Sequence, residues 1–308
     1  MKTTAAGKPK IGHYFEYAAL HCVNAVVNII PRKLALVLGS IVGRVLYRLG
    51  IYQKTVRANF DHVGIWENDE IRKIIPKLYR NIGRYAMDFL RGGRRLPVYR
   101  LHDYNIYTEA RAKTNGTIII LAHFGNWELL AAIFGRQVDD LNVIAKPMKN
   151  PLVEKWLLKK RTALSVETIY TNNALRGMLA ALKRNGITAI LIDQYLGRQM
   201  GTPAPFLGKI ASTVRTAAGL VRKTGAAAVP VYAIMNGDGS YDIHFFEADP
   251  PVVMHSDVND SAQIDEDATV SAIQAQHNDI ISSWITKHPD HWFGWFHKRF
   301  KEYLDYKS

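Results

Sequence analysis

The sequence predicts an α/β fold with a central, mainly parallel sheet flanked by helices, preceded by a helical N-terminal extension. From residue 117 onward, short apolar runs typical of buried parallel strands alternate with helical segments. The first 95 residues carry only helical patterns. The chain has 308 residues, of which 48% are hydrophobic and 22% charged, and this composition suits one large ordered domain with a substantial core.

The N-terminal extension, residues 1–95, begins with two apolar stretches at 14–30 and 34–49. The first falls just short of the roughly 18–20 apolar residues that a spanning helix needs. A spanning anchor, helices in the membrane interface and amphipathic helices packed on the core all remain open. A cleaved signal peptide is disfavoured because no small-residue cleavage site follows. We expect a membrane-associating extension, since basic residues flank both stretches.

The remaining elements are predicted from the spacing of apolar residues. A helix is expected over 68–91, and the glycines and Pro97 that follow interrupt its pattern. Strands are expected at 117–122, 143–146, 166–170, 187–192, 226–234 and 241–246, and helices at 126–134, 151–163, 173–184, 212–223 and 268–287. Ser212 or Thr213 would cap the helix at 212. No flexible linker is visible, so residues 1–95 and the α/β part, 96–308, are expected to pack as one unit.

The charge balance favours an anionic partner. Lys and Arg number 40 against 27 Asp and Glu, which gives a net charge of +13. Such a surface attracts nucleic acid, anionic lipid headgroups or an acidic protein. No nucleic-acid-binding signature stands out, so a nucleic-acid partner is not expected. Cys22 is the only cysteine, the histidines lack partners at metal-ligand spacing, and no phosphate-binding glycine loop occurs, so neither a metal nor a cofactor is expected.

The motif His123-Phe-Gly-Asn-Trp-Glu128 is the sharpest chemical feature of the chain. It follows a predicted strand and precedes a predicted helix, and the carboxyl ends of parallel strands are where open α/β sheets bind ligands. Gly125 permits a tight turn, and Asn126 can cap the helix. An imidazole can take a proton from an alcohol, and a carboxylate on its other nitrogen fixes the tautomer. We therefore expect Glu128 to meet His123; a histidine bonded to backbone beside a surface glutamate is the alternative.

Two other segments admit two interpretations each. Residues 197–209 contain glycine, proline and Lys209, which predicts a basic loop that is either a lid or headgroup contact, or an ordinary connection. Near the C-terminus, aromatic residues mixed with basic ones suit a membrane-interface belt or an aromatic core. The aromatic residues are Trp284, Trp292, Phe293, Trp295 and Phe296.

The segment Leu121–Glu128, LAHFGNWE, resembles the signature block of the bacterial lipid A lauroyl- and myristoyltransferases. These belong to the glycerolipid acyltransferase superfamily with a His-x4-Asp/Glu motif. The resemblance runs over most of the chain. The further matching segments are Arg57–Phe60, Asn150-Pro151 with Arg161, Ile192–Gln194, Phe206–Gly208, Thr213, Thr224–Pro230 and His288–Arg299. Phe60 stands where the family has leucine, and the closing segment is one residue longer around Gly294.

The resemblance implies that His123 is the general base, that Glu128 is its partner, and that Arg161 and Asp193 complete the site. Arg161 could hold a phosphate of the acceptor or stabilise an oxyanion. Asp193 ends a predicted strand and could orient Arg161 or a backbone amide. A solvated arginine and a turn-forming aspartate are the alternatives. Asn126 and Lys209 are further candidates for contact with the substrate.

The family resemblance implies an O-acyltransferase of lipid A, and hence lipopolysaccharide, biosynthesis at the cytoplasmic face of the bacterial inner membrane. The expected donor is acyl-acyl carrier protein, and the acceptor is a hydroxyl of a Kdo-bearing lipid A precursor. Both partners are anionic, which suits the charge of +13. One alternative is O-acylation of another glycolipid or phospholipid, such as a phosphatidylinositol mannoside or an aminolipid, from acyl-CoA. Another is a non-catalytic membrane-binding protein that keeps only the fold.

Overall fold

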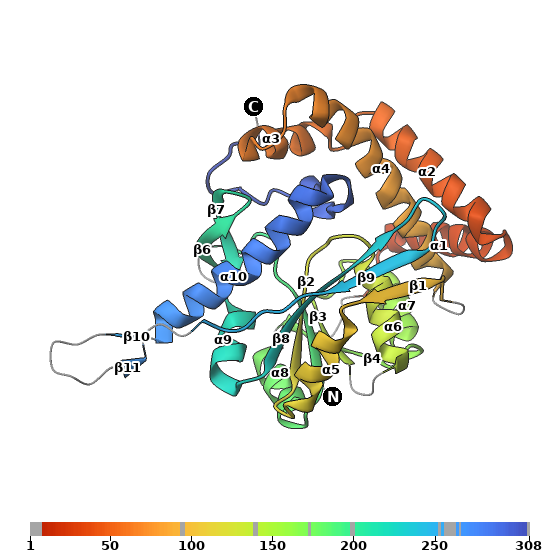
Figure 1. Ribbon diagram of the computed structural model, residues 1–308. Coiled ribbons are helices and arrows are strands. Elements are labelled where there is room, and N and C mark those ends of the chain that lie inside the picture. Colours follow the sequence, from red (N-terminus) through yellow and green to blue (C-terminus); the bar gives the residue numbers. More distant parts are fainter. Residues whose placement is uncertain are drawn as a thin grey trace.

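A computed structural model of the protein describes residues 8–92, 96–137, 141–171, 174–197, 201–251, 254–255, 263–264 and 266–306. Its centre is a seven-stranded sheet with the order β1-β9-β8-β2-β5-β3-β4 (Figure 1). The strands are β1 (Tyr99–His102), β2 (Thr117–Leu121), β3 (Leu141–Ala145), β4 (Val166–Tyr170), β5 (Ile187–Leu191), β8 (Ala227–Met235) and β9 (Tyr241–Phe245). All neighbours in this sheet pair in parallel except β8 and β9. The predicted α/β class with a mainly parallel sheet is therefore confirmed.

Helices cover both faces of the sheet, because alternate side chains of each strand point to opposite faces. Ile118 and Ile120 of β2 belong to one buried apolar cluster, and Ile119 and Leu121 belong to another. The first face is covered by α8 (Ala174–Lys183), α9 (Thr216–Thr224) and α10 (Glu266–Lys287). The second is covered by α5 (Tyr104–Ala112) and α6 (Trp127–Gln137), and α7 (Pro151–Thr162) lies against β4. The strands β2 and β5 are therefore buried on both faces, as their continuous apolar runs predict.

The N-terminal helices are α1 (Ile11–Ile29), α2 (Arg32–Arg48), α3 (Gln53–Val63) and α4 (Asn68–Arg91), along the top and right of Figure 1. The helical nature of this part and the predicted helix at 68–91 are confirmed. Among the described residues, no single helix meets the length and hydropathy of a membrane span, although α2 and α3, bent by 83° at their junction, meet it as a pair. The extension's contact with a membrane stays a prediction.

Asn59 of α3 joins the helical extension to the rest of the chain. Its buried side-chain amide donates to the backbone oxygens of Trp295, at 2.8 Å, and His297, at 2.9 Å. Phe60 stacks on Trp295 with ring centroids 3.9 Å apart. The Asn59-Phe60 segment therefore holds the C-terminal segment in place, although the division at residue 95 stays a prediction.

The predicted helix at 212–223 was wrong in its first part. Residues Gly201–Phe206 (β6) and Lys209–Val214 (β7) form an antiparallel hairpin, and the helix α9 starts only at Thr216. The same hairpin replaces most of the loop expected at 197–209. Leu207 and Gly208 have φ values of 50° and 70°, which matches a two-residue turn that suits the twist of a hairpin. Leucine rarely adopts a positive φ, so no residue pattern typical of a hairpin turn marks this position.

Three shorter features complete the chain. The strand β1 and the helix α5 were not predicted. Short strands β10 (Met254–His255) and β11 (Gln263–Ile264) pair outside the main sheet. Trp284 of the aromatic cluster lies in α10. The other members follow α10, Trp292 between two 3₁₀ turns, η2 (Pro289–His291) and η3 (Phe293–Phe296), and the remaining three in η3. The three tryptophans of the cluster are fully buried, so an aromatic core rather than an interface belt describes them.

Candidate active site

His123 and Asp193 lie side by side because they follow neighbouring parallel strands. The register of β2 and β5 pairs Leu121 with Leu191. Two residues further on, His123 and Asp193 therefore reach the same edge of the sheet at the same level. Oδ1 of Asp193 lies 2.8 Å from Nδ1 of His123, and Oδ2 accepts the backbone N–H of His123 at 2.9 Å.

The carboxylate of Asp193 is fully buried yet strongly hydrogen-bonded. A third N–H, Nε1 of Trp292, donates to its Oδ2 at 2.7 Å. Burial alone would raise the pKa of Asp193, but the charge of His123 and the hydrogen bonds from His123 and Trp292 together lower it to about 2. An ionised carboxylate can only accept hydrogen bonds, so Nδ1 of His123 carries its proton and the lone pair of the ring is on Nε2.

Nε2 of His123 faces Gln194, the residue that follows Asp193. The side-chain nitrogen of Gln194 lies 3.2 Å from this Nε2 and 3.4 Å from Nε2 of His297. The His123 side chain keeps 18% of its surface exposed, whereas that of Asp193 has none. The imidazole is thus oriented by Asp193 on its Nδ1 side, while its Nε2 faces the Gln194 amide and the side chain as a whole is partly exposed.

Glu128 does not bind His123, so the predicted contact between them was wrong. Instead, Oε1 of Glu128 lies 2.7 Å from the guanidinium of Arg161, with both side chains largely buried. Glu128 occupies the first turn of α6 and Arg161 the last turn of α7, where each charge suits the helix dipole. The carboxylate on the imidazole is Asp193, because the strand register brings it there while the start of α6 turns Glu128 toward α7.

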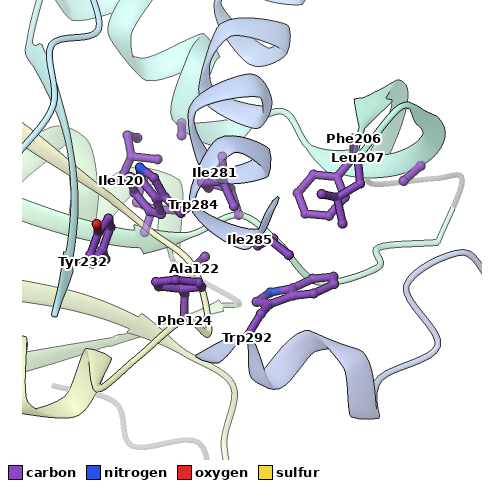
Figure 2. Close-up of a cluster of buried hydrophobic side chains, with 14 of the residues drawn as sticks. Ile120, Ala122, Phe124, Phe206, Leu207, Tyr232, Ile281, Trp284, Ile285 and Trp292 are labelled. Carbon is purple, nitrogen blue, oxygen red and sulfur yellow. The ribbon is translucent and has the colours of Figure 1, made fainter. Parts of the chain in front are cut away.

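The C-terminal segment closes the site from one side. The backbone N–H of Phe293 donates to the carbonyl of His123 at 2.7 Å, and that of Gly125 donates to the carbonyl of His291 at 2.8 Å. Gly125 has φ 61°, and a side chain there would overlap the carbonyl oxygen of Ala233. In Figure 2, Trp292 lies between Phe124, just after β2, and the hairpin residues Phe206 and Leu207. The segment therefore fixes both the turn after β2 and the carboxylate of Asp193.

Comparison with known proteins identifies the family of this chain. The family model of bacterial lipid A biosynthesis acyltransferases matches residues 6–302. This chain belongs to that family. The protein is therefore an O-acyltransferase of lipid A biosynthesis, and the predicted resemblance is confirmed.

Two curated relatives show how far this acyltransferase has diverged. One is the lipid A biosynthesis palmitoleoyltransferase of Escherichia coli (strain K12), which is 25% identical over 240 residues. The other is the lipid A biosynthesis acyltransferase of Shigella flexneri, at the same identity and length. In each case the match covers 76% of this chain and 73% of the relative.

The other predicted site residues of the acyltransferase have different positions. Asn126 is buried; its Oδ1 accepts the N–H of Leu129 at 3.0 Å, so it caps α6 as expected, and its amide donates to the hydroxyl of Tyr241 at 2.9 Å. Both the oxygen and the nitrogen of the Asn126 side chain thus form hydrogen bonds inside the protein. Lys209 begins β7, and its charge lowers the pKa of His62 after the larger effect of burial. Contact of either residue with substrate stays a prediction.

Sequence reasoning missed that Trp292 and His297 lie beside the His123–Asp193 pair. Both belong to the closing segment, in which aromatic and basic residues were noted without a link to His123. The strand register could have paired His123 with Asp193, because each stands two residues beyond a pair of apolar strands. Nothing in the sequence alone placed the closing segment beside that pair.

Proposed function

We propose that this acyltransferase moves a fatty acyl chain from acyl-acyl carrier protein to a hydroxyl of a lipid A precursor, at the cytoplasmic face of the inner membrane. The observation that carries the proposal is the buried Asp193 carboxylate on Nδ1 of a partly exposed His123. This arrangement leaves a basic nitrogen, Nε2, whose neighbour is the neutral Gln194 amide.

The reaction needs no covalent intermediate on the protein. The acceptor hydroxyl displaces the Gln194 amide from Nε2 of His123 and gives that nitrogen its proton as its oxygen attacks the thioester carbonyl. Asp193 stabilises the resulting imidazolium. The tetrahedral intermediate then expels the thiolate of the carrier, which takes the proton from Nε2. The products are the new ester and the free thiol, so the atoms balance.

Arg161 supplies positive charge near this site, and Glu128 positions it. The guanidinium lies 2.7 Å from Glu128, and among the described residues its buried Nε has no hydrogen-bond partner. Both residues, with Asn126, line a cavity of about 30 Å³, which is room for one water molecule. We assign to Arg161 an electrostatic function toward the acyl carbonyl or the acceptor, and to Glu128 the function of orienting Arg161.

The first helices give the acyltransferase a surface suited to a membrane. Of the 22 exposed large hydrophobic side chains among the described residues, 16 lie between Ile11 and Tyr52. A soluble surface rarely gathers so many apolar side chains in one region. Exposed basic residues accompany them, including Lys33, Arg44 and Arg48. We infer that α1 and α2 lie in the interface of an anionic membrane, which also holds the lipid acceptor.

The test is transfer of a radiolabelled acyl chain by the purified protein. A lipid A precursor with acyl-acyl carrier protein should be the productive pair, and acyl-CoA with phosphatidylinositol mannoside or an aminolipid should give little product. His123→Ala should lower kcat by about a thousandfold, because it removes the general base. His102→Ala, on an edge strand away from this site, should retain the wild-type rate.

The folding of each variant is checked by circular dichroism and thermal melting. Unchanged transfer by His123→Ala would remove the base from the mechanism. A preference for acyl-CoA and a different acceptor would replace the proposed substrates while keeping the reaction.

A further inference from the structure

A second, larger cavity opens beside the Glu128–Arg161 pair. Its volume is about 480 Å³, within the range of about 300–1,000 Å³ typical of ligand pockets. It lies where α1, the end of α4 and α7 meet; α1 contacts both of the other helices. Lys160 and Leu164 line both this cavity and the small cavity that contains Glu128 and Arg161. The two spaces are therefore neighbours.

The lining of this cavity is strongly basic. It includes four cationic side chains, those of Arg91, Arg136, Lys159 and Lys160, and no aspartate or glutamate occurs among the described residues that line it. Arg136 and Lys159 are exposed. Four like charges around one space repel one another in the absence of a ligand, so an anion that enters is favoured.

Lys160 is held at the wall of the cavity rather than in bulk water. Its ammonium group donates to the backbone oxygen of Phe89 and lies 4.1 Å from the ring centroid of Phe89 and 4.8 Å from that of Trp156. No carboxylate is hydrogen-bonded to it among the described residues. Burial lowers the pKa of Lys160 to about 8, and the more distant charge of Glu128 opposes this effect. The positive charge of the Lys160 ammonium group is thus only partly neutralised by its surroundings, and a bound anion would neutralise it further.

Neutral polar side chains also line the cavity. These are His21, Asn24 and Asn28 of α1. With about 3.6 residues per turn, these three side chains share one side of α1, while the exposed Phe15 and Val26 lie on the other. The helix that presents an apolar side to a membrane therefore presents its polar side to the basic cavity.

We propose that this cavity is a phosphate site, which holds a phosphate group of the sugar headgroup of the acceptor lipid beside the site of acyl transfer. Phosphate matches a cluster of arginine and lysine donors, and the amides of α1 can bind sugar hydroxyls. The location between the apolar side of α1 and Arg161 suits a headgroup whose acyl chains remain in the membrane. The inference rests on the proposed function for the identity of the acceptor, but the binding of phosphate can be measured without turnover.

The kinetic test pairs the double variant Arg136→Ala/Lys159→Ala with phosphorylated and enzymatically dephosphorylated forms of the same lipid A precursor. Both residues are exposed, so folding should be unaffected. With the phosphorylated acceptor, KM should rise about tenfold or more at nearly constant kcat, because two charge-assisted contacts are lost. With the dephosphorylated acceptor, variant and wild type should have the same KM.

The matched control is Lys183→Ala/Lys223→Ala, which removes the same two charges. These exposed lysines lie near the ends of α8 and α9, which cover the opposite face of the sheet from α6, and neither lysine lines the cavity. The control should behave as the wild type with both acceptors. If it raises KM as much as the Arg136/Lys159 variant does, the effect comes from net charge and the phosphate site is refuted.

The phosphate ester of the donor's pantetheine arm is the other source of such a ligand. If the Arg136/Lys159 variant raises KM for acyl-acyl carrier protein and not for the acceptor, the assignment to the acceptor is wrong. Titration with glucosamine 1-phosphate, followed by tryptophan fluorescence, gives a readout independent of catalysis, because Trp156 lines the cavity. The wild type should bind glucosamine 1-phosphate, and the Arg136/Lys159 variant should not. The change in fluorescence should be lost in Trp156→Phe. Absence of binding to the wild type would overturn the proposal even if transfer occurs.

Discussion

The indole of Trp292 and the backbone and ring of His123 together keep a buried carboxylate charged. Asp193 has no exposed side-chain surface, yet three N–H groups donate to its two oxygens. A buried carboxylate that lost one of these donors would be less stable in its ionised form. Trp292 is therefore a positioning residue, which acts on the imidazole through Asp193.

Trp292→Phe should reduce acyl transfer beyond its effect on stability. Loss of the N–H donor leaves Asp193 less well held, so kcat should fall by about tenfold while KM stays nearly constant. Trp295→Phe is the matched control: this indole is equally buried in the same segment, but its Nε1 donates to the backbone oxygen of Pro289 at 2.8 Å. Both variants should lose similar thermal stability. Equal loss of kcat in the two would show that Trp292 has only a structural function.

The candidate site shows which residues the sequence could and could not assign. His123 and Asp193 were both predicted to lie at the carboxyl edge of the sheet, because apolar strands precede them. They are 70 residues apart in the chain, and only the pairing of β2 with β5 brings them into contact. Glu128 was assigned to His123 from its distance along the chain and from the family resemblance, whereas the direction in which α6 begins turns Glu128 toward Arg161.

The contact between α2 and α4 depends on glycines. Gly39 and Gly43 of α2 face α4, where Gly83 lies opposite Gly39. A side-chain carbon on Gly43 would overlap the carbonyl oxygen of Tyr79, and one on Gly83 would overlap that of Gly39. The backbones can approach this closely only because no side chains separate them. The apolar outer side of α2 is thereby held in a fixed position on α4.

Gly43→Ala should destabilise the fold. The added methyl group meets backbone rather than a movable side chain, so the helices must separate, at a cost of about 1–3 kcal/mol. Gly219→Ala in α9 is the matched control, because a methyl group there meets no atom within 4 Å and should stabilise the helix by about 0.5–1 kcal/mol. Urea unfolding followed by circular dichroism measures both. Equal stability of the two variants would contradict the close approach of α2 and α4.

Elements in which apolar residues recur at a clear spacing were predicted from the sequence. Elements that depend on contacts with distant segments were not. The helix at 68–91 was predicted with its observed bounds, and the strands β2, β4 and β5 to within one residue. The hairpin β6–β7 was missed because its second strand, KIASTV, has no clear alternation of apolar and polar residues. Residues far away in the sequence hold this strand in place. Arg299, buried near the C-terminus, donates to the carbonyl of Ser212 and the hydroxyl of Thr213. Such contacts between distant segments have no local signal.

Unfolding of the whole molecule should depend on pH through buried histidines. Burial lowers the pKa of His277 to about 4, so the folded protein keeps this ring neutral, while the unfolded chain takes up a proton below about pH 6.5. The contribution of His277 to the free energy of unfolding should therefore be constant above about pH 6.5 and should fall as the pH drops from 6.5 to 4, by up to about 1.4 kcal/mol per unit. His291 adds to this slope for the same reason.

His277→Gln should reduce that slope, because it removes a group that takes up a proton on unfolding. Chemical denaturation at a series of pH values gives the slope for the variant and for the wild type. A slope in His277→Gln equal to that of the wild type would show that His277 does not titrate on unfolding.

At the scale of the whole molecule, the apolar outer side of α1 and α2 and the net charge of +13 together predict binding to anionic membranes. The full-length protein should sediment with vesicles that contain anionic lipid, and less so with neutral vesicles or at high salt. Val26→Asp should weaken this binding by about tenfold, because a charge at the interface must be desolvated. Leu175→Asp is matched to it, since both side chains are 54% exposed, and should bind as the wild type does. Equal binding by both variants would place the membrane contact elsewhere on the protein.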